Sequence, residues 1–207
     1  KQPLRVEVAP SGTVAEKVEQ EVFIVPKHQK LELLGKLLNE YLGTVLVFSR
    51  TKHGAKKIAH AVSMMGHRAA ELHSNRSLGQ RREALDGFRS GKYRVLIATD
   101  IAARGIDVTG IELVINFDLP DNSEDYVHRI GRTGRAGLTG KAISLACPEQ
   151  KRDIQAIERL IQTKIPIAQL PDTLRSEPPK VLSMAPRTEG SRPPRYHSQR
   201  THGRRRR

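Results

Sequence analysis

The sequence predicts an α/β fold in which a mostly parallel sheet carries helices on both faces. From about residue 21, short apolar segments rich in β-branched residues alternate with segments of helical periodicity, which is typical of repeated strand–helix–strand units. Most of the short segments are nearly continuous in apolar residues, as expected for strands that are covered on both sides. The 207 residues are enough for one well-buried domain and a tail.

Six segments are expected to form the strands of this sheet. They are EVFIVP at 21–26, TVLVFS at 44–49, RAAELH at 68–73, YRVLIAT at 93–99, ELVINF at 112–117 and KAISLA at 141–146. Between them, apolar side chains recur at the spacing of one helix face. Helices are expected near residues 31–41, 52–65, 77–90 and 154–161. Their apolar stripes belong to the core and not to a site.

Composition divides the chain into three parts. Residues 1–20 are polar and interrupted by proline, as in an interdomain linker, and residues 21–170 form the expected domain. Residues 171–207 hold six prolines and ten Lys and Arg against three Asp and Glu, so we expect a disordered basic tail. Because the chain begins at Lys1 without an initiator methionine, we expect it to be part of a longer protein.

The charge balance favours a polyanionic partner. Lys and Arg number 36 against 22 Asp and Glu, a formal net charge of +14. The single Cys147 cannot form an internal disulfide, and no His or Cys cluster has the spacing of metal ligands, so no metal site is expected in this chain. No apolar run approaches the roughly 18 residues of a membrane span. These features predict a cytoplasmic protein without membrane contact.

Polar residues gather in the loops after two of the predicted strands, where open α/β sheets bind their ligands. After 93–99, the residues Thr99, Arg104, Gly105 and Asp107 place a hydroxyl, a cation, a glycine and a carboxylate close together in sequence. Such a loop is suited to phosphate and ribose. Asp100 in the same loop either caps a short helix or binds a ligand.

The loop after 112–117 holds two arginines, Arg132 and Arg135, among glycines 131, 134 and 137. Asn122 or Ser123 is expected to cap a short helix before them. Arginine is a permanently charged, forked donor that suits the oxygens of a transferring phosphoryl group. Two arginines at this spacing alone are typical of a solvated helix face. The surrounding glycines and the loop position favour a ligand instead.

Four strings resemble the motifs of one family in order and spacing. VFSRT (47–51), FRSG (88–91), ATDIAARGID (98–107) and HRIGRTGR (128–135) resemble motifs IV, IVa, V and VI of DEAD-box RNA helicases. The resemblance covers about residues 20–170. It implies the second, RecA-like C-terminal lobe of an ATP-dependent RNA helicase. The Arg-rich, Pro-bearing tail resembles that of bacterial members of the RhlE type.

The resemblance also implies roles for single residues. Arg132 and Arg135 correspond to arginines that reach the ATP γ-phosphate, and Asp107 corresponds to the carboxylate that binds the ATP ribose. His128 and Arg129 correspond to residues that link the nucleotide to the contacts between the lobes. Contacts to the RNA sugar–phosphate backbone, or links from it to the ATP site, are implied for Ser49, Arg50, Thr51, Arg81, Gly91, Thr99, Arg104 and Gly105. Thr51 could equally cap the helix at 52–65.

Two departures from the family pattern lie before and within the predicted helix at 77–90. Leu78 stands where the family has the glutamine of a Q-x-x-R element, and Gln80 follows two residues later. Ser74 replaces the usual glycine after His73. These changes concern the local RNA contact of Arg81.

The implied activity needs a second lobe. The chain has no GxxxxGK[ST] phosphate loop and no DEAD string, so ATP and Mg²⁺ are expected to be held mainly by an N-terminal lobe in cis. ATP and RNA would close the cleft between the lobes and disrupt a short duplex, and the isolated lobe should be inactive. The alternatives are a non-enzymatic RNA-binding or dimerisation module and, disfavoured by HRIGRTGR, a DNA helicase lobe. Ribosome-assembly and RNA-decay factors are the candidate protein partners.

Overall fold

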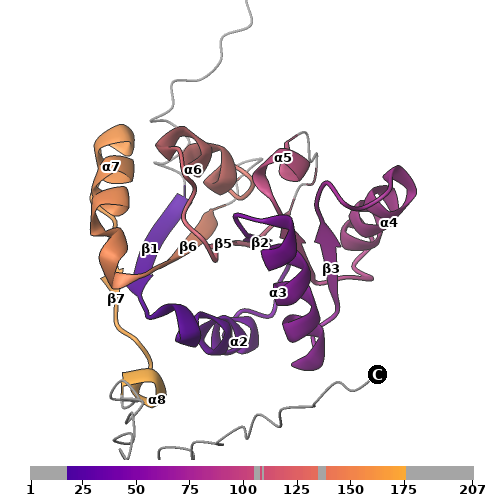
Figure 1. The fold of residues 1–207 in the computed structure, drawn as a ribbon, viewed down its shortest axis with the longest axis horizontal. Helices are drawn as coiled ribbons and strands as arrows, with labels where there is room; N and C mark the ends of the chain where they lie inside the picture. The colour runs from indigo at the N-terminus through magenta and orange to yellow at the C-terminus, as the bar shows by residue number, and fades with distance from the viewer. Residues whose placement is uncertain (1–17, 105–107, 109, 135–138, 176–207) are drawn as a thin grey trace, which may run out of the picture. The chain divides into compact units, whose positions relative to one another are not determined.

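The sheet has seven strands and is parallel throughout. The computed structural model describes residues 18–104, 108, 110–134 and 139–175. The strands lie in the order β3-β4-β2-β5-β6-β1-β7 (Figure 1). They are β1 (Val18–Ile24), β2 (Val45–Phe48), β3 (Ala69–Leu72), β4 (Val95–Ala98), β5 (Leu113–Asn116), β6 (Gly140–Ala146) and β7 (Ile167–Ala168). The six predicted strands are confirmed. The two-residue β7 is too short to leave a sequence pattern.

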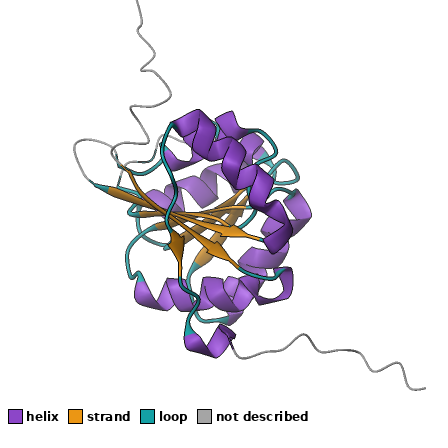
Figure 2. Cartoon of the chain, turned by 90° about the vertical axis from the view of Figure 1, so that its left-hand side faces the viewer, coloured by secondary structure: helices purple, strands orange, loops and turns teal. Residues whose placement is uncertain are grey.

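Helices cover both faces of this sheet, as predicted (Figure 2). They are α2 (Lys30–Glu40), α3 (Lys52–Met64), α4 (Leu78–Arg89), α5 (Asp100–Ala103), α6 (Ser123–Ile130), α7 (Lys151–Ile161) and α8 (Asp172–Arg175), with 3-10 turns η1 (Lys27–Gln29) and η2 (Pro148–Gln150). Successive strand residues face opposite layers. Leu46 and Phe48 pack under α4, α5, α6 and α7, whereas Val45 and Val47 pack against α2 and α3.

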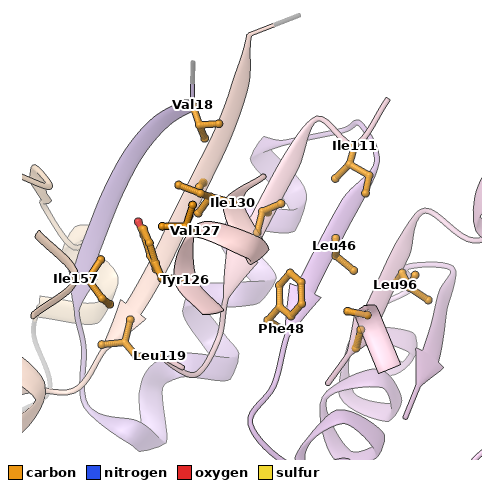
Figure 3. Close-up of a cluster of buried hydrophobic side chains, with 14 of the residues drawn as sticks. Val18, Leu46, Phe48, Leu96, Ile111, Leu119, Tyr126, Val127, Ile130 and Ile157 are labelled. Carbon is orange, nitrogen blue, oxygen red and sulfur yellow. The ribbon is translucent and has the colours of Figure 1, made fainter. Parts of the chain in front are cut away.

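Packing of α6 on the sheet positions the loop that holds the predicted arginines. Tyr126, Val127 and Ile130 point from α6 toward the strands, near Phe48 of β2 and Ile157 of α7 (Figure 3). Burying a large apolar side chain stabilises a fold by about 1.5–3 kcal/mol. The residues just beyond Ile130 are therefore attached to a firmly packed helix.

Side-chain caps fix where three helices begin. Thr51 Oγ1 accepts a hydrogen bond from Gly54 N at 3.0 Å, so the capping alternative for Thr51 is confirmed. Asn122 caps α6 through Glu124 N at 3.2 Å. Ser77 and Gln80 form a capping box at the start of α4. The Gln80 side chain is thus engaged by the helix, and Leu78 is largely exposed.

The folded part extends beyond the predicted bounds at both ends. Strand β1 begins three residues before position 21, and α8 follows position 170 with Leu174 buried against the α2–α3 layer. Most of the predicted linker and tail, residues 1–17 and 176–207, lies outside the described residues. Among the helices of the described ranges, none has the length and apolarity needed to cross a membrane.

His67 should make the stability of this domain depend on pH. Arg94 Nη2 lies 2.9 Å from His67 Nδ1 and also donates to Leu38 O at 2.9 Å. Burial, together with the charge of Arg94, lowers the pKa of His67. Its folded pKa lies below the unfolded value of about 6.5. The contribution of neutral His67 to the free energy of unfolding is therefore complete above about pH 6.5, and it is lost as the pH falls through the folded pKa.

A His67→Gln variant removes this titration but keeps a hydrogen-bond acceptor for Arg94. Urea unfolding between about pH 7 and about pH 5 should show a smaller loss of free energy of unfolding in the variant than in the parent protein. Equal losses in the two proteins would contradict the assignment.

Candidate functional site

The carboxyl ends of the parallel strands meet at one edge of the sheet. Strands β4, β2 and β5 are neighbours in that order, so the loops that follow them lie side by side. Residues 49–51 follow β2, Thr99 and α5 follow β4, and residues 117–121 lead from β5 to α6. The structure therefore brings the predicted motifs IV, V and VI together, as expected for a site at the carboxyl edge.

A buried ion pair joins α5 to α6. Arg129 is 1% exposed, and its guanidinium donates to both carboxylate oxygens of Asp100 at 2.6 and 2.7 Å. It also donates to Asp118 O at 2.6 Å and lies 5.0 Å from the centre of the Phe48 ring. The N-cap of α5 is Thr99, so Asp100 is the first residue of the helix and does not cap it, while its assignment to a ligand stays a prediction. Asp100 and Arg129 instead hold the two motif helices together.

Asp118 is a second junction, which the sequence did not reveal. One carboxylate oxygen of Asp118 accepts hydrogen bonds from Ser49 Oγ at 3.2 Å and from Arg50 N at 3.1 Å. The other lies 3.9 Å from Nζ of Lys30, which donates to Phe117 O at 2.8 Å. Burial lowers the pKa of Lys30, against the opposing charge of Asp118. A carboxylate directly after a buried strand is the one sequence signal that could have identified this residue.

A small hollow lies beside the Asp100–Arg129 pair and is lined mostly by polar side chains. The lining residues are Phe48, Asp100, Ala103, Arg104, Asp125, His128, Arg129 and Arg132. The side chains of Arg104 and His128 are 71% and 70% exposed, and both approach Asp125 Oδ1, at 3.4 and 3.9 Å. Of the eight lining residues, four are Arg or His and two are carboxylates. The hollow therefore favours an anion.

A buried hydrogen bond anchors the turn after α6. Thr133 is buried, and its Oγ1 donates to Ile111 O at 2.5 Å. This bond holds the turn against the loop before β5, with the half-buried Arg132 next to it. Arg135, Gly105 and Asp107, which were also predicted as site residues, lie outside the described residues. Within the described ranges, no group of three or more His, Cys, Asp and Glu could hold a metal ion.

The predicted RNA contacts are distributed unevenly around the edge. Ser49 is fully buried, and Arg50 donates to Leu119 O at 3.2 Å and pairs with Asp121 at 3.2 Å. Thr51 and Thr99 lie at the starts of α3 and α5. Arg81 is half-buried in the first turn of α4, which follows the carboxyl end of β3.

Gly91 does not lie at this edge, which corrects its predicted place in the RNA-backbone surface. It follows the last turn of α4 and precedes the amino end of β4, so it lies at the opposite edge of a parallel sheet from Ser49. Its φ of 75° is the left-handed conformation that favours glycine, and its N–H bonds to Phe88 O at 3.2 Å. The glycine is required by the end of the helix.

This topology, with its site at the carboxyl edge, defines a RecA-like α/β domain. Residues 29–137 match the family model described as helicase conserved C-terminal domain, which is just over half of the chain. The chain belongs to this family and, by its likeness to the solved structures below, to its DEAD-box branch.

Solved DEAD-box structures have the same fold. The Escherichia coli DEAD-box protein SrmB, bound to regulator of ribonuclease activity A, is 34% identical with a TM-score of 0.72, over 76% of this chain and 94% of that chain. A DEAD box protein from Methanococcus jannaschii is 39% identical with a TM-score of 0.71, over 75% and 43%. Saccharomyces cerevisiae Dbp5, bound to RNA and ADP BeF3, is 29% identical with a TM-score of 0.72, over 79% and 44%.

Curated relatives are ATP-dependent RNA helicases named RhlB. The Cronobacter sakazakii protein is 42% identical over 187 residues, and the Klebsiella pneumoniae protein is 40% identical over 190 residues. These alignments cover 88% and 91% of this chain but 44% and 45% of the relatives, so the chain spans less than half of their length. The expected RhlE-type likeness rested on tail composition alone and is replaced by this likeness to RhlB.

Proposed function

We propose that this chain is the C-terminal lobe of an ATP-dependent RNA helicase, and that it contributes arginines to ATP and a backbone-binding surface to RNA. The observation that carries the proposal is the meeting of residues 49–51, α5 and α6 at one edge of the sheet, around a hollow lined by Arg104, His128 and Arg132. The names of the RhlB relatives agree with this activity.

The residues of the hollow suit a triphosphate. Arg132, with Arg135 three residues later in sequence, would supply forked donors to the γ-phosphate oxygens, where they stabilise charge during phosphoryl transfer. Asp125 lies near Arg104 and His128 beside them, at 3.4 and 3.9 Å. When bound, ATP would supply the transferred phosphoryl group. Mg²⁺ would be held mainly by the N-terminal lobe. The lobe described here contributes charge and position, which dominate catalysis of phosphoryl transfer.

RNA would bind along the starts of α3, α4 and α5. Thr51, Thr99 and Arg81 lie at these starts, where the positive end of the helix dipole favours an anionic phosphate. Contacts to phosphate and to 2′-hydroxyl groups are common to every RNA, so binding should be independent of sequence. Closure of the two lobes on ATP and RNA would then strain a short duplex and separate its strands locally.

ATP hydrolysis by the two-lobe protein that contains this chain tests the proposal. We expect single-stranded RNA to stimulate hydrolysis and DNA of the same sequence to do so much less, because the 2′-hydroxyl groups are absent. The isolated chain should hydrolyse no measurable ATP, since it lacks the phosphate loop. RNA binding without any hydrolysis by the two-lobe protein would overturn the proposal and favour a non-enzymatic RNA-binding module.

A further inference from the structure

One short segment touches both halves of the proposed site. Residues 117–121 connect β5 to α6 and lie between Ser49 and Arg50 on one side and Arg129 on the other. The carboxylate of Asp118 accepts from Ser49 Oγ and Arg50 N, at 3.2 and 3.1 Å. Its backbone carbonyl accepts from Arg129 Nη1 at 2.6 Å. A single residue thus bonds to the loop assigned to RNA and to the helix assigned to ATP.

The contacts continue without interruption to the far side of the hollow. The Arg129 guanidinium donates both to Asp118 O and to the carboxylate of Asp100, the first residue of α5. Arg104 directly follows the last residue of α5 and approaches Asp125 of α6 at 3.4 Å. Hydrogen bonds thus link the backbone at Arg50 to α6 and α5 through Asp118, Arg129 and Asp100.

We propose that Asp118 is a positioning residue that couples RNA binding to the nucleotide site. This inference rests on the proposed function. When both ligands are bound, the Asp118 carboxylate holds the backbone at Ser49 and Arg50, where RNA is expected to bind. Its backbone carbonyl holds the Arg129 side chain and thereby the position of α6. Coupling of this kind requires a contiguous element that both ligands bias, and the segment at 117–121 fits that requirement.

A purely structural role for Asp118, as the counter-ion of buried Lys30, accounts for fewer of its contacts. The distance from Lys30 Nζ to Asp118 Oδ1 is 3.9 Å, which is too long for a hydrogen bond. Lys30 Nζ instead donates to Phe117 O at 2.8 Å. The hydrogen bonds of the carboxylate go to Ser49 and Arg50, so its main geometric effect is on the predicted RNA loop.

Three variants of the two-lobe protein separate these roles. Asp118→Ala removes both side-chain bonds but keeps the carbonyl that binds Arg129. Asp118→Asn keeps an acceptor oxygen for Ser49 and Arg50. Asp121→Ala is the matched control, because Asp121 is a carboxylate of the same segment that only forms an exposed pair with Arg50. The dissociation constant of a fluorescent RNA is measured with and without a non-hydrolysable ATP analogue, and their ratio is the coupling factor.

We expect Asp118→Ala to reduce the coupling factor by about 10-fold or more, while RNA affinity without nucleotide changes by less than about 3-fold. Asp118→Asn and Asp121→Ala should keep the factor within about 3-fold of the parent protein. An unchanged factor in Asp118→Ala would overturn the proposal. An equal loss in Asp118→Asn would also overturn it, because the charge and not the hydrogen bonds would then matter.

Two further measurements keep the outcomes distinct. If Asp118→Ala fails to fold because Lys30 is left without a counter-charge, the double variant Lys30→Met/Asp118→Ala removes both charges and should again show the reduced coupling factor. A coupling factor equal to that of the parent protein in this folded double variant would overturn the proposal. If the parent protein itself binds no RNA or no nucleotide, the proposed function fails and the inference fails with it.

Discussion

Replacing Arg132 with alanine in the two-lobe protein should lower the rate of ATP hydrolysis by about 10³-fold or more. Arg132 lies in the turn after α6 and lines the hollow with Arg104 and His128. A guanidinium that meets the γ-phosphate acts mainly in the transition state, where negative charge spreads over the phosphoryl oxygens. The loss should therefore appear in kcat more than in the KM for ATP.

Two further variants test whether the loss of turnover is specific to the forked donor of Arg132. They are Arg132→Lys and Arg152→Ala. Lysine keeps the charge but not the forked donor, so Arg132→Lys should recover only a small part of the rate. Arg152 is an exposed arginine on α7, outside the hollow, and its removal should leave turnover unchanged. Circular dichroism melting curves check that each variant is folded. Full turnover in both Arg132 variants would refute the assignment, and Arg135→Ala gives a second, independent test of it.

Much of the fold could be predicted from the sequence, because buried parallel strands leave continuous apolar runs that are hard to mistake. The bounds of the predicted strands agree with the structure to within about three residues, and the order β4-β2-β5 in the sheet explains why three motifs meet. That order is a property of the chain's path and leaves no local pattern in the residues. The contacts of Asp100 and Asp118 depend on it, so neither could be deduced from the sequence.

Arg129 shows how a motif can conceal a structural residue. The resemblance assigned it to the nucleotide, together with His128. Helical spacing separates the two, because Tyr126, Arg129 and Ile130 share the face of α6 that packs on the sheet, whereas His128 lies on the exposed face. The assignment of Arg129 to the nucleotide stays a prediction, and the structure gives it a position in the core. Gly91 was misplaced for a related reason, since a turn that resembles a family motif can serve the end of a helix.

Removing the Arg129 side chain should cost far more stability than removing Arg104, although each forms an ion pair between α5 and α6. The pair of Arg129 with Asp100 is buried on the arginine side, at 1% exposure, and Arg129→Ala would leave several acceptors unpaired. Breaking a buried pair from one side costs about 3–5 kcal/mol. The Arg104 side chain is 71% exposed, and such surface pairs contribute about 1 kcal/mol or less.

Thermal and urea unfolding of this chain measure the difference. For a domain of this size, the loss in Arg129→Ala corresponds to a decrease in Tm of about 6–20 °C. A double variant, Asp100→Leu/Arg129→Met, should recover part of that loss, because two apolar side chains replace a desolvated pair without leaving an unpaired charge. Equal and small losses in Arg129→Ala and Arg104→Ala would mean that the buried pair is not what holds α5 against α6. The hollow between these helices would then depend on apolar packing alone.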